Sequence, residues 1–399
     1  MTRGVTIVIP TWNGLELLER FLPSVITAAH HYSNNSGAPT EIVVVDDGSK
    51  DTTVNWLVSR GFVYTELNDQ MQATVQGGEV AKPKVPGTLE PEESEIPATR
   101  IVGDVSQTTF TLLKNSSNLG FGETCNRGFR VARHPLVLLL NNDVEIASDA
   151  IAPLVANFTD ESIFAVHCRV FELQSGRQCG TGKLGSFARG SIRVHRSYVL
   201  TGRETGNLVI SENRSLAGPL YSMFAGGGSA MFDKRNFLDI GGFDSLLSPF
   251  YWEDVELSYR AWKRGLIVLY EPRSVARHQV SSTIGKLDRR GVRKIEQRNR
   301  LIYHWIHLQD PSLLLSHLFW LCILTVTAPL RLKFDFIPAL LSAIKRLPRV
   351  RKRRREEKRA ARRNDREVFA IFEAMLGRSD LFAYDSYEEL EQKRGSTNR

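Results

Sequence analysis

Leu136-Val137-Leu138-Leu139-Leu140 is an unbroken apolar run that leads directly into Asn141-Asn142-Asp143-Val144-Glu145. Five consecutive apolar residues are typical of a strand that is buried on both faces of a parallel sheet. The amide and carboxylate side chains that follow would then lie at the carboxyl end of that strand. Ligands of open α/β sheets bind beyond the carboxyl ends of the strands. This stretch therefore predicts an α/β fold and the edge of the sheet that carries a binding site.

Strand and helix signals alternate through the first 60 residues. Strands are expected at 5–9 and 41–45, and helices with apolar spacing at 15–29 and 52–59. Such alternation is typical of parallel β-α-β units, so we expect a mainly parallel central sheet.

Length and composition indicate a mostly globular chain. The 399 residues, 42% of them hydrophobic, suggest two domains or one large domain with an appendage. Four cysteines without a CxxC pair favour neither a zinc site nor a disulfide framework, which fits a reducing cytosol. The first residues run straight into the strand expected at 5–9, so no signal peptide is predicted.

Residues 69–107 interrupt the alternation. They are polar, rich in proline and aperiodic. This composition predicts a long flexible surface insertion. A lid over the site is the less favoured alternative.

The last quarter of the chain changes character. Residues 313–330 are strongly apolar, and residues 345–366 carry 13 Lys and Arg against three acids, which accounts for the net charge of +8. The apolar stretch is long enough to span a membrane, but the basic segment would then lie outside the cytosol, against the positive-inside rule. We expect helices on or partly in the inner leaflet, with the basic segment at anionic lipid. An apolar helix packed on the main domain, followed by a solvated basic helix, stays open.

Six short motifs follow one another between residues 4 and 305. They are Val5–Gly14, Val45–Thr52, Asn118–Gly122, Leu140–Asp143, Gly241–Asp244 and Trp252–Leu257. In this order they resemble the inverting glycosyltransferases of family 2, and His278 is placed as in members similar to rhamnosyl- and galactofuranosyltransferases. The resemblance implies a GT-A fold at 1–305. The remaining residues, 306–399, would form a helical membrane-associating and basic tail.

The resemblance also implies a pocket for a nucleoside-diphosphate sugar. Asp47 would accept the imino N–H of uracil, thymine or guanine, which leaves the base open. The other residues expected along this pocket are Pro10, Thr11, Asn13, Asn118 and Asn142. The alternative for Asp46 and Asp47 is that they cap the next helix or turn, and for Asp46 it is equally favoured.

Asn141-Asn142-Asp143 corresponds to the acidic metal-binding motif of the family. Asp143 is the expected main ligand, with His278 and Asn141 beside it. Oxygen ligands suit Mg²⁺ or Mn²⁺, and a histidine favours Mn²⁺. Asn141 stands where many relatives have an acid, which weakens the expected site. Glu145 would point the other way along an extended chain and is not expected to be a ligand.

Glu253 and Asp254 are the expected catalytic acids. They precede the helix predicted at 255–264, which Gly265 ends, and the strand at 266–270 with a loop carrying His278 would follow. Inverting transfer needs a carboxylate that accepts the proton of the attacking hydroxyl, a role we assign to Asp254. Glu253 would orient or bind the acceptor.

Two neighbours strengthen this assignment. Tyr251 and Trp252 directly precede the acids and could offer an aromatic face to a sugar. The alternative is that the two acids only complement the helix dipole.

The motifs together predict an inverting, metal-assisted glycosyltransferase at the inner face of the cell membrane. It would act on a glycan or lipid-linked acceptor. The alternative is a catalytically silent scaffold, which loss of Asp254 or Asp143 would have marked, and both are present. Binding of nucleic acid through residues 345–366 ranks last, because this segment has no interleaved aromatic residues.

Overall fold

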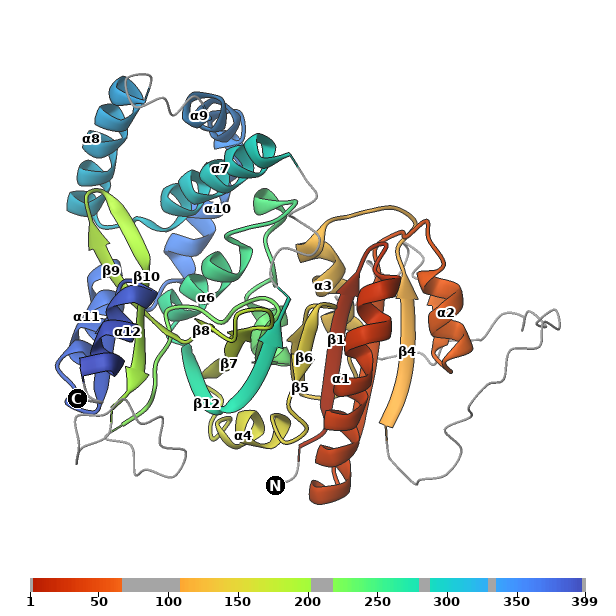
Figure 1. Ribbon diagram of the computed structural model, residues 1–399. Coiled ribbons are helices and arrows are strands. Elements are labelled where there is room, and N and C mark those ends of the chain that lie inside the picture. The colour runs from red at the N-terminus through yellow and green to blue at the C-terminus, as the bar shows by residue number, and fades with distance from the viewer. Residues whose placement is uncertain (1–2, 67–107, 202–217, 280–287, 329–334, 397–399) are drawn as a thin grey trace.

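The structure is a computed structural model that describes residues 3–66, 108–201, 218–279, 288–328 and 335–396 (Figure 1). Among these residues the main sheet has ten strands in the order β3-β4-β2-β1-β5-β11-β7-β12-β6, with β8 paired to β7. A smaller sheet has the order β13-β10-β9. The insertion expected at 69–107 lies outside the described residues.

Five parallel strands form one half of the main sheet. They are β1 (Val5–Thr11), β2 (Thr40–Asp46), β3 (Val63–Glu66), β4 (Thr108–Lys114) and β5 (Leu136–Leu140). Every residue of β1, β2 and β5 is buried, as their apolar runs require. The predicted strands at 5–9, 41–45 and 136–140 and the mainly parallel α/β sheet are confirmed.

Helices α1 (Leu15–Ser36), α2 (Thr53–Ser59) and α3 (Phe121–Val131) belong to this half. The first is seven residues longer than the stretch predicted at 15–29, and Gly37 directly after it has a φ of 68°, which glycine adopts most readily. Helix α3 lies directly on the sheet, because a Cβ at Gly128 would come within 2.4 Å of Val8.

The other half of the main sheet is mixed. Strand β11 (Ser229–Asp233) runs antiparallel between β5 and β7 (Ile163–Glu172). The remaining strands are β6 (Val144–Ile146), β8 (Gln178–Gly180) and β12 (Ile267–His278), and β12 is parallel to β7. Here the prediction of a loop at His278 is wrong. Strand β12 continues past an irregularity between Glu271 and Val275, because β6 and β7 keep pairing with it as far as His278.

Three short helices and α6 (Glu253–Lys263) accompany these strands. The short ones are α4 (Ile151–Ala156), α5 (Lys234–Asp239) and the single 3₁₀ turn η3 (Ser245–Leu247). Helix α6 confirms the prediction at 255–264 and begins at Glu253. The chain reverses just beyond it at Gly265, with a φ of 88°.

The C-terminal helices join the small sheet on one side of the molecule (Figure 1). The strands are β9 (Gly182–Ala188), β10 (Ser191–Leu200) and β13 (Leu381–Tyr384). The helices are α7 (Arg289–His307), α8 (Pro311–Thr327), α9 (Phe336–Ile344), α10 (Leu347–Ala360), α11 (Asp365–Leu376) and α12 (Tyr387–Ser396). The expected C-terminal helices are therefore confirmed, whereas a domain division at residue 305 stays a prediction.

Helix α10 carries most of the basic segment and is anchored along one face. Its Val350 and Glu357 are buried, and Glu357 pairs with Arg264 at 2.8 Å just beyond α6. In the part of the chain that the structure covers, no helix combines the length and the apolarity needed to cross a membrane.

Candidate active site

The residues expected to bind a donor gather at the carboxyl ends of β1, β2 and β5. The Asn142 side-chain amide donates to Thr11 Oγ1 at 2.9 Å, which joins the ends of β1 and β5. Pro10 and Thr11 are both buried in β1. Gly14 is required beside them, since a Cβ there would come within 2.3 Å of Thr11 Oγ1. Close packing of backbone and polar side chains thus shapes this corner.

Asn13 joins the loops that follow β1 and β2. Its Oδ1 accepts a hydrogen bond from the Lys50 N–H at 2.8 Å, and its own N–H donates to Ser49 Oγ at 2.7 Å. Its φ of 47° is in the left-handed region, which asparagine tolerates better than most residues. Asn13 therefore holds the rim of the pocket through both its backbone and its side chain.

Asp47 organises the loop at 118–120. Its Oδ1 accepts hydrogen bonds from the Leu119 N–H and from the Asn115 side chain, both at 2.8 Å, and its Oδ2 accepts from the Gly120 N–H at 2.9 Å. Asn118 is exposed beside this carboxylate, and its Oδ1 also accepts from the Gly120 N–H. A carboxylate that already accepts three hydrogen bonds is rigidly oriented toward the strand ends.

Asp46 has a different environment. It is fully buried, and its Oδ2 accepts from the Ser49 N–H at 3.0 Å, so it does hold the turn after β2. Its Oδ1 is buried and has no hydrogen-bond partner among the described residues. Burial raises the pKa of this carboxyl above the ordinary value.

Asp143 and His278 come together although they are far apart in sequence. The pairing of β6 with β12 places Val144 opposite His278, and His278 Nε2 lies 3.1 Å from Asp143 Oδ1. Glu145 instead pairs with Arg277 at 3.5 Å, as expected for a residue outside the site. A carboxylate and an imidazole therefore converge at the end of β5.

Asn141 faces the glycine run at 226–228. Its N–H donates to the Gly228 carbonyl at 3.1 Å, and a Cβ at Gly228 would lie only 2.4 Å from its side-chain nitrogen. Within the described ranges no group of three or more His, Cys, Asp and Glu side chains could hold a metal ion. Asp143 and His278 supply one hard oxygen and one nitrogen donor, a set that fits Mn²⁺ if ligands from outside the protein complete the shell.

Glu253 and Asp254 open helix α6 next to the same glycine run. Asp254 Oδ2 accepts a hydrogen bond from the Gly227 N–H at 3.3 Å, and its Oδ1 accepts from the Val255 N–H at 2.8 Å. The run at 226–228 thus contacts Asn141 on one side and Asp254 on the other. The two acidic motifs lie on either side of one short backbone segment.

The surroundings of Glu253 and Asp254 shift the pKa values of the two carboxyl groups by different causes. Burial raises the pKa of Asp254, but its two backbone hydrogen bonds favour the ionised form. Burial and the neighbouring Asp254 raise the pKa of Glu253 to about 8, and its Oε2 is buried without a hydrogen-bond partner in the described structure. The pair therefore loses its first proton mainly from Asp254, and Glu253 stays protonated at neutral pH.

Tyr251 and Trp252 directly before these acids differ in exposure. Tyr251 is 38% exposed, but Trp252 is buried and packs against Tyr303 with 5.4 Å between the ring centroids. Of these two rings, only that of Tyr251 is open to a ligand.

Glu253 also lines a small pocket. The other lining residues are Leu119, Gly122, Glu123, Phe243, Asp244, Ser245, Leu247, Ser248 and Pro249.

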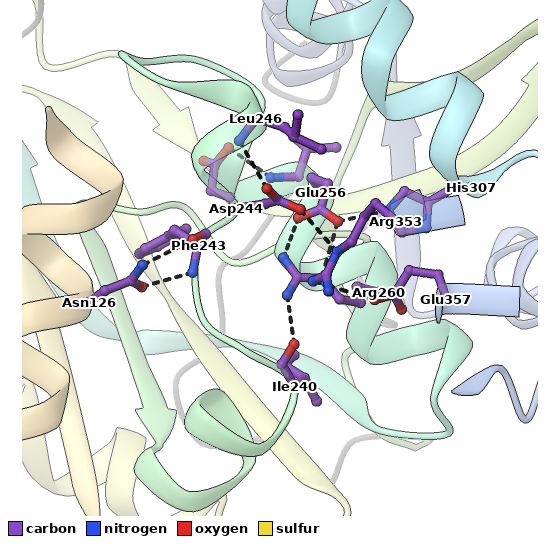
Figure 2. Close-up of polar contacts among 12 residues, drawn as sticks. Asn126, Ile240, Phe243, Asp244, Leu246, Glu256, Arg260, His307, Arg353 and Glu357 are labelled. Atoms are coloured by element: carbon purple, nitrogen blue, oxygen red, sulfur yellow. Dashed lines mark hydrogen bonds and ion pairs between the residues drawn. The ribbon is translucent and has the colours of Figure 1, made fainter. Parts of the chain in front are cut away.

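Several residues that hold this pocket were not singled out in the sequence. The Asn126 side chain of α3 pairs with both backbone groups of Phe243, at 2.9 Å and 3.0 Å (Figure 2). Arg260 Nη1 donates to the Ile240 carbonyl at 2.7 Å. No signal in the sequence distinguishes Asn126, because the same stretch of α3 also contains the polar Thr124 and Arg127.

Two family models match the chain. Residues 97–296 match the model described as glycosyltransferase like family 2, and residues 6–62 match glycosyl transferase family 2. Curated relatives include the poly-beta-1,6-N-acetyl-D-glucosamine synthases of Staphylococcus aureus strains COL and MRSA252. Each is 21% identical over 296 residues, which cover 73% of this chain and 53% of the relative. The chain spans about half the length of these relatives.

Solved structures with a similar arrangement share little sequence. GalNAc-T7 with UDP, GalNAc and Mn²⁺ is 17% identical, with a TM-score of 0.48 over 77% of this chain and 49% of that one. The mannosyltransferase PcManGT from Pyrobaculum calidifontis with GDP-Man and Mn²⁺ is 17% identical, with a TM-score of 0.44 over 87% of both chains. TarS 1–349 from S. aureus is 13% identical, with a TM-score of 0.45 over 94% and 91%.

The raised pKa of Glu253 predicts how the free energy of unfolding changes with pH. Because the folded state keeps this proton longer than the unfolded state, its contribution is fully present below pH 4.5 and is lost as the pH rises toward 8. Glu253→Gln should therefore gain stability relative to wild type as the pH rises, by about 1.4 kcal/mol for each unit of pKa shift. Urea unfolding at pH 4.5, 6 and 8 measures this difference. The exposed Glu161→Gln is the control, and a pH-independent difference for Glu253→Gln would contradict the assignment.

Proposed function

The chain belongs to glycosyltransferase family 2, and from this premise we propose that it is an inverting glycosyltransferase with the GT-A fold that serves cell-surface polysaccharide synthesis. It moves a sugar from a nucleoside diphosphate to a glycan or lipid-linked acceptor. The observation that carries the proposal is the glycine run at 226–228, which contacts Asn141 on one side and Asp254 on the other. The polysaccharide synthases among the curated relatives favour a glycan acceptor.

The donor nucleotide occupies the corner at the ends of β1 and β2. Asp47 accepts the imino N–H of the base through the lone pairs that its three hydrogen bonds leave available. The pocket residues around it are Pro10, Thr11, Asn13, Asn118 and Asn142. The link from Asn142 to Thr11 supports this grouping, because it ties the base side of the pocket to the diphosphate side.

Asp143 and His278 hold a divalent cation, with Asn141 beside them. The close approach of the carboxylate and the imidazole supports this pairing. When bound, Mn²⁺ or Mg²⁺ neutralises negative charge on the departing diphosphate. The histidine favours Mn²⁺ of the two.

Asp254 acts as the general base. It accepts the proton of the acceptor hydroxyl as that oxygen attacks the anomeric carbon from the face opposite the diphosphate. Its two backbone hydrogen bonds hold the ionised carboxylate in place. Glu253, protonated at neutral pH, donates a hydrogen bond to the acceptor in the adjoining pocket. Two carboxyls with separated pKa values thus take separate roles.

The protein works at the inner face of the cell membrane, where a lipid-linked acceptor is held. Helix α8 has no polar face, yet it and α9 expose large apolar side chains, and both helices lie at the top of the molecule in Figure 1. These side chains are Leu315, Leu318, Phe319, Val326, Leu341 and Ile344. Exposed basic residues follow directly at the end of α9 and on α10. Apolar and basic side chains in this combination suit an anionic lipid surface.

Nucleotide binding is tested by thermal unfolding with UDP, dTDP, GDP and CDP, each with and without Mn²⁺. At 100 times its dissociation constant the matching nucleotide should stabilise the fold by about 2.7 kcal/mol. His278→Ala should remove the metal-dependent part of the shift. An unchanged Mn²⁺ response in that variant would exclude His278 as a ligand, and no shift with any nucleotide would favour a catalytically silent scaffold.

Asp254→Asn is expected to abolish transfer. The amide cannot accept the proton, so the rate should fall at least about 10²-fold, the usual lower value for general-base catalysis. The metal-dependent nucleotide shift should stay as in wild type, because the amide has nearly the same shape. Release of nucleoside diphosphate during turnover measures the rate. Turnover near that of wild type would refute the assignment of the base.

Lipid contact is tested by sedimentation with vesicles. Wild type should bind vesicles that contain phosphatidylglycerol more tightly than vesicles of phosphatidylcholine alone, and salt should weaken the binding. Replacing Leu315 and Phe319 with serine should weaken it more than tenfold, because each buried apolar side chain contributes about 1.5–3 kcal/mol. Val63→Ser, which changes an exposed apolar residue near α2, is the control. Equal binding of all three proteins would refute this surface.

A further inference from the structure

The loop from Asp244 to Trp252, here called the acceptor loop, leads directly into the catalytic helix. Tyr251 and Trp252 both adopt left-handed backbone conformations, with φ of 70° and 73°. For bulky residues such conformations are unfavourable and persist only where neighbouring groups enforce them. Glu253 and Asp254 follow immediately, so their placement depends on whatever holds this loop.

Asn299 of α7 holds the end of the acceptor loop. Its side-chain nitrogen donates to the carbonyls of Leu247, Phe250 and Tyr251, the last two at 2.9 Å each. The residue is fully buried. The two N–H groups of this amide are thus shared among three carbonyls at the end of the loop.

Arg298 sets the orientation of that amide. Its Nε and Nη2 donate to Asn299 Oδ1 at 2.9 Å and 2.8 Å, so the oxygen faces the guanidinium and the nitrogen faces the loop. Arg298 Nη2 also donates to the Ser248 carbonyl at 2.6 Å. The two adjacent side chains together contact four of the five carbonyls between residues 247 and 251.

Arg353 of α10 holds the start of the loop. Its Nε lies 2.9 Å from Asp244 Oδ2, while Asp244 Oδ1 accepts from the Leu246 N–H at 2.9 Å (Figure 2). The same guanidinium lies 3.4 Å from the buried Glu357 carboxylate. Its side chain is only 20% exposed, whereas Arg351 and Arg355 on the same helix are exposed. Arg353 thus lies on the inward face of α10, unlike Arg351 and Arg355.

We infer that Asn299, Arg298 and Arg353 are positioning residues that keep the acceptor loop strained and so keep Glu253 and Asp254 beside Gly227. The inference rests on the proposed function for the role of the two acids, but the mechanical part stands on the contacts alone. A released loop would relax toward ordinary backbone angles and shift the first turn of α6. A shift of about 1 Å at a reacting group can cost 10²-fold in rate.

Asn299→Asp is the sharpest test. Aspartate keeps the size and the acceptor for Arg298, but it turns an oxygen toward the three loop carbonyls. Chymotrypsin should then cleave after Phe250 or Tyr251 at least tenfold faster than in wild type. Glu253 should also reach water; because the new carboxyl at position 299 titrates as well, the effect is measured as the stability difference between Asn299→Asp and Asn299→Asp/Glu253→Gln, which should no longer vary with pH. A general loss of stability would instead accelerate cleavage at all sites alike, so cleavage after Phe250 and Tyr251 is compared with cleavage after the buried Phe129 in the same variant.

Arg353→Ala tests the other end, with Arg351→Ala as the matched control on the same helix. Arg353→Ala should accelerate the same cleavage, and Arg351→Ala should not. The thermal-unfolding screen selects one nucleotide, and sugar derivatives of that nucleotide are the substrates for a hydrolysis assay. For Asn299→Asp and Arg353→Ala the kcat of this hydrolysis should fall about tenfold or more. The donor KM should be unchanged, because the nucleotide corner lies on other elements.

The outcomes separate the two proposals. Wild-type cleavage rates and a wild-type pH dependence in both Asn299→Asp and Arg353→Ala would overturn the inference. Should Asn299→Asp fail to fold, Arg298→Lys, which keeps the charge but loses the fork to Asn299, replaces it with the same expectations. If wild type binds no nucleotide and hydrolyses no sugar nucleotide, the proposed function fails, and the cleavage test still decides whether the three residues hold the loop.

Discussion

The buried carboxylate of Glu256 is the constraint on which the rest of the site depends. Glu256, Arg260 and His307 all have fully buried side chains, and His307 Nε2 lies 2.8 Å from Glu256 Oε1. Arg260 and His307 hold the pKa of Glu256 well below its usual range despite burial. The ion pair of Glu256 with Arg260 lies within α6, whereas its contact with His307 joins α6 to α7, so separating the two helices would leave a buried imidazole nitrogen without a hydrogen-bond partner. Helix α6 carries Glu253 and Asp254, and α7 carries Asn299, so this cluster helps to set the distance between the two proposed catalytic acids and the residue that holds the loop before them.

Much of the first half of the fold could be predicted because its information is local. The strands at 5–9, 41–45 and 136–140 are continuous apolar runs, and each is buried in the structure as such runs require. The second half depends on pairings that no local pattern reveals. Strand β6 is three residues long, and β12 extends to His278 only because β6 and β7 pair with its far end. A strand that a distant partner lengthens looks like a loop in the sequence.

The residues of the candidate site also differ in whether the local sequence reveals them. Motif residues such as Asp143 and Asp254 stand out because short acidic clusters follow or precede strong secondary-structure signals. Arg353, by contrast, is one of 13 basic residues in its segment. What distinguishes it is its position on the face of α10 that packs against the rest of the protein. Val350, Arg353 and Glu357 are spaced by three and four residues, so they share one face, and that face meets the body of the protein. The apolar Val350 was the signal in the sequence that this face points inward.

The small sheet has a consequence for synthesis of the chain on the ribosome. Strand β10 pairs with β13, so that Ser197 lies opposite Tyr384. Until residues 381–384 have been translated, one edge of β10 has unpaired N–H and C=O groups, which invite pairing with other chains. Helix α10, which supplies Arg353, is also translated long after α6. The N-terminal strands can pair early during translation, but Glu253 and Asp254 reach their final setting only after α10 has also left the ribosome.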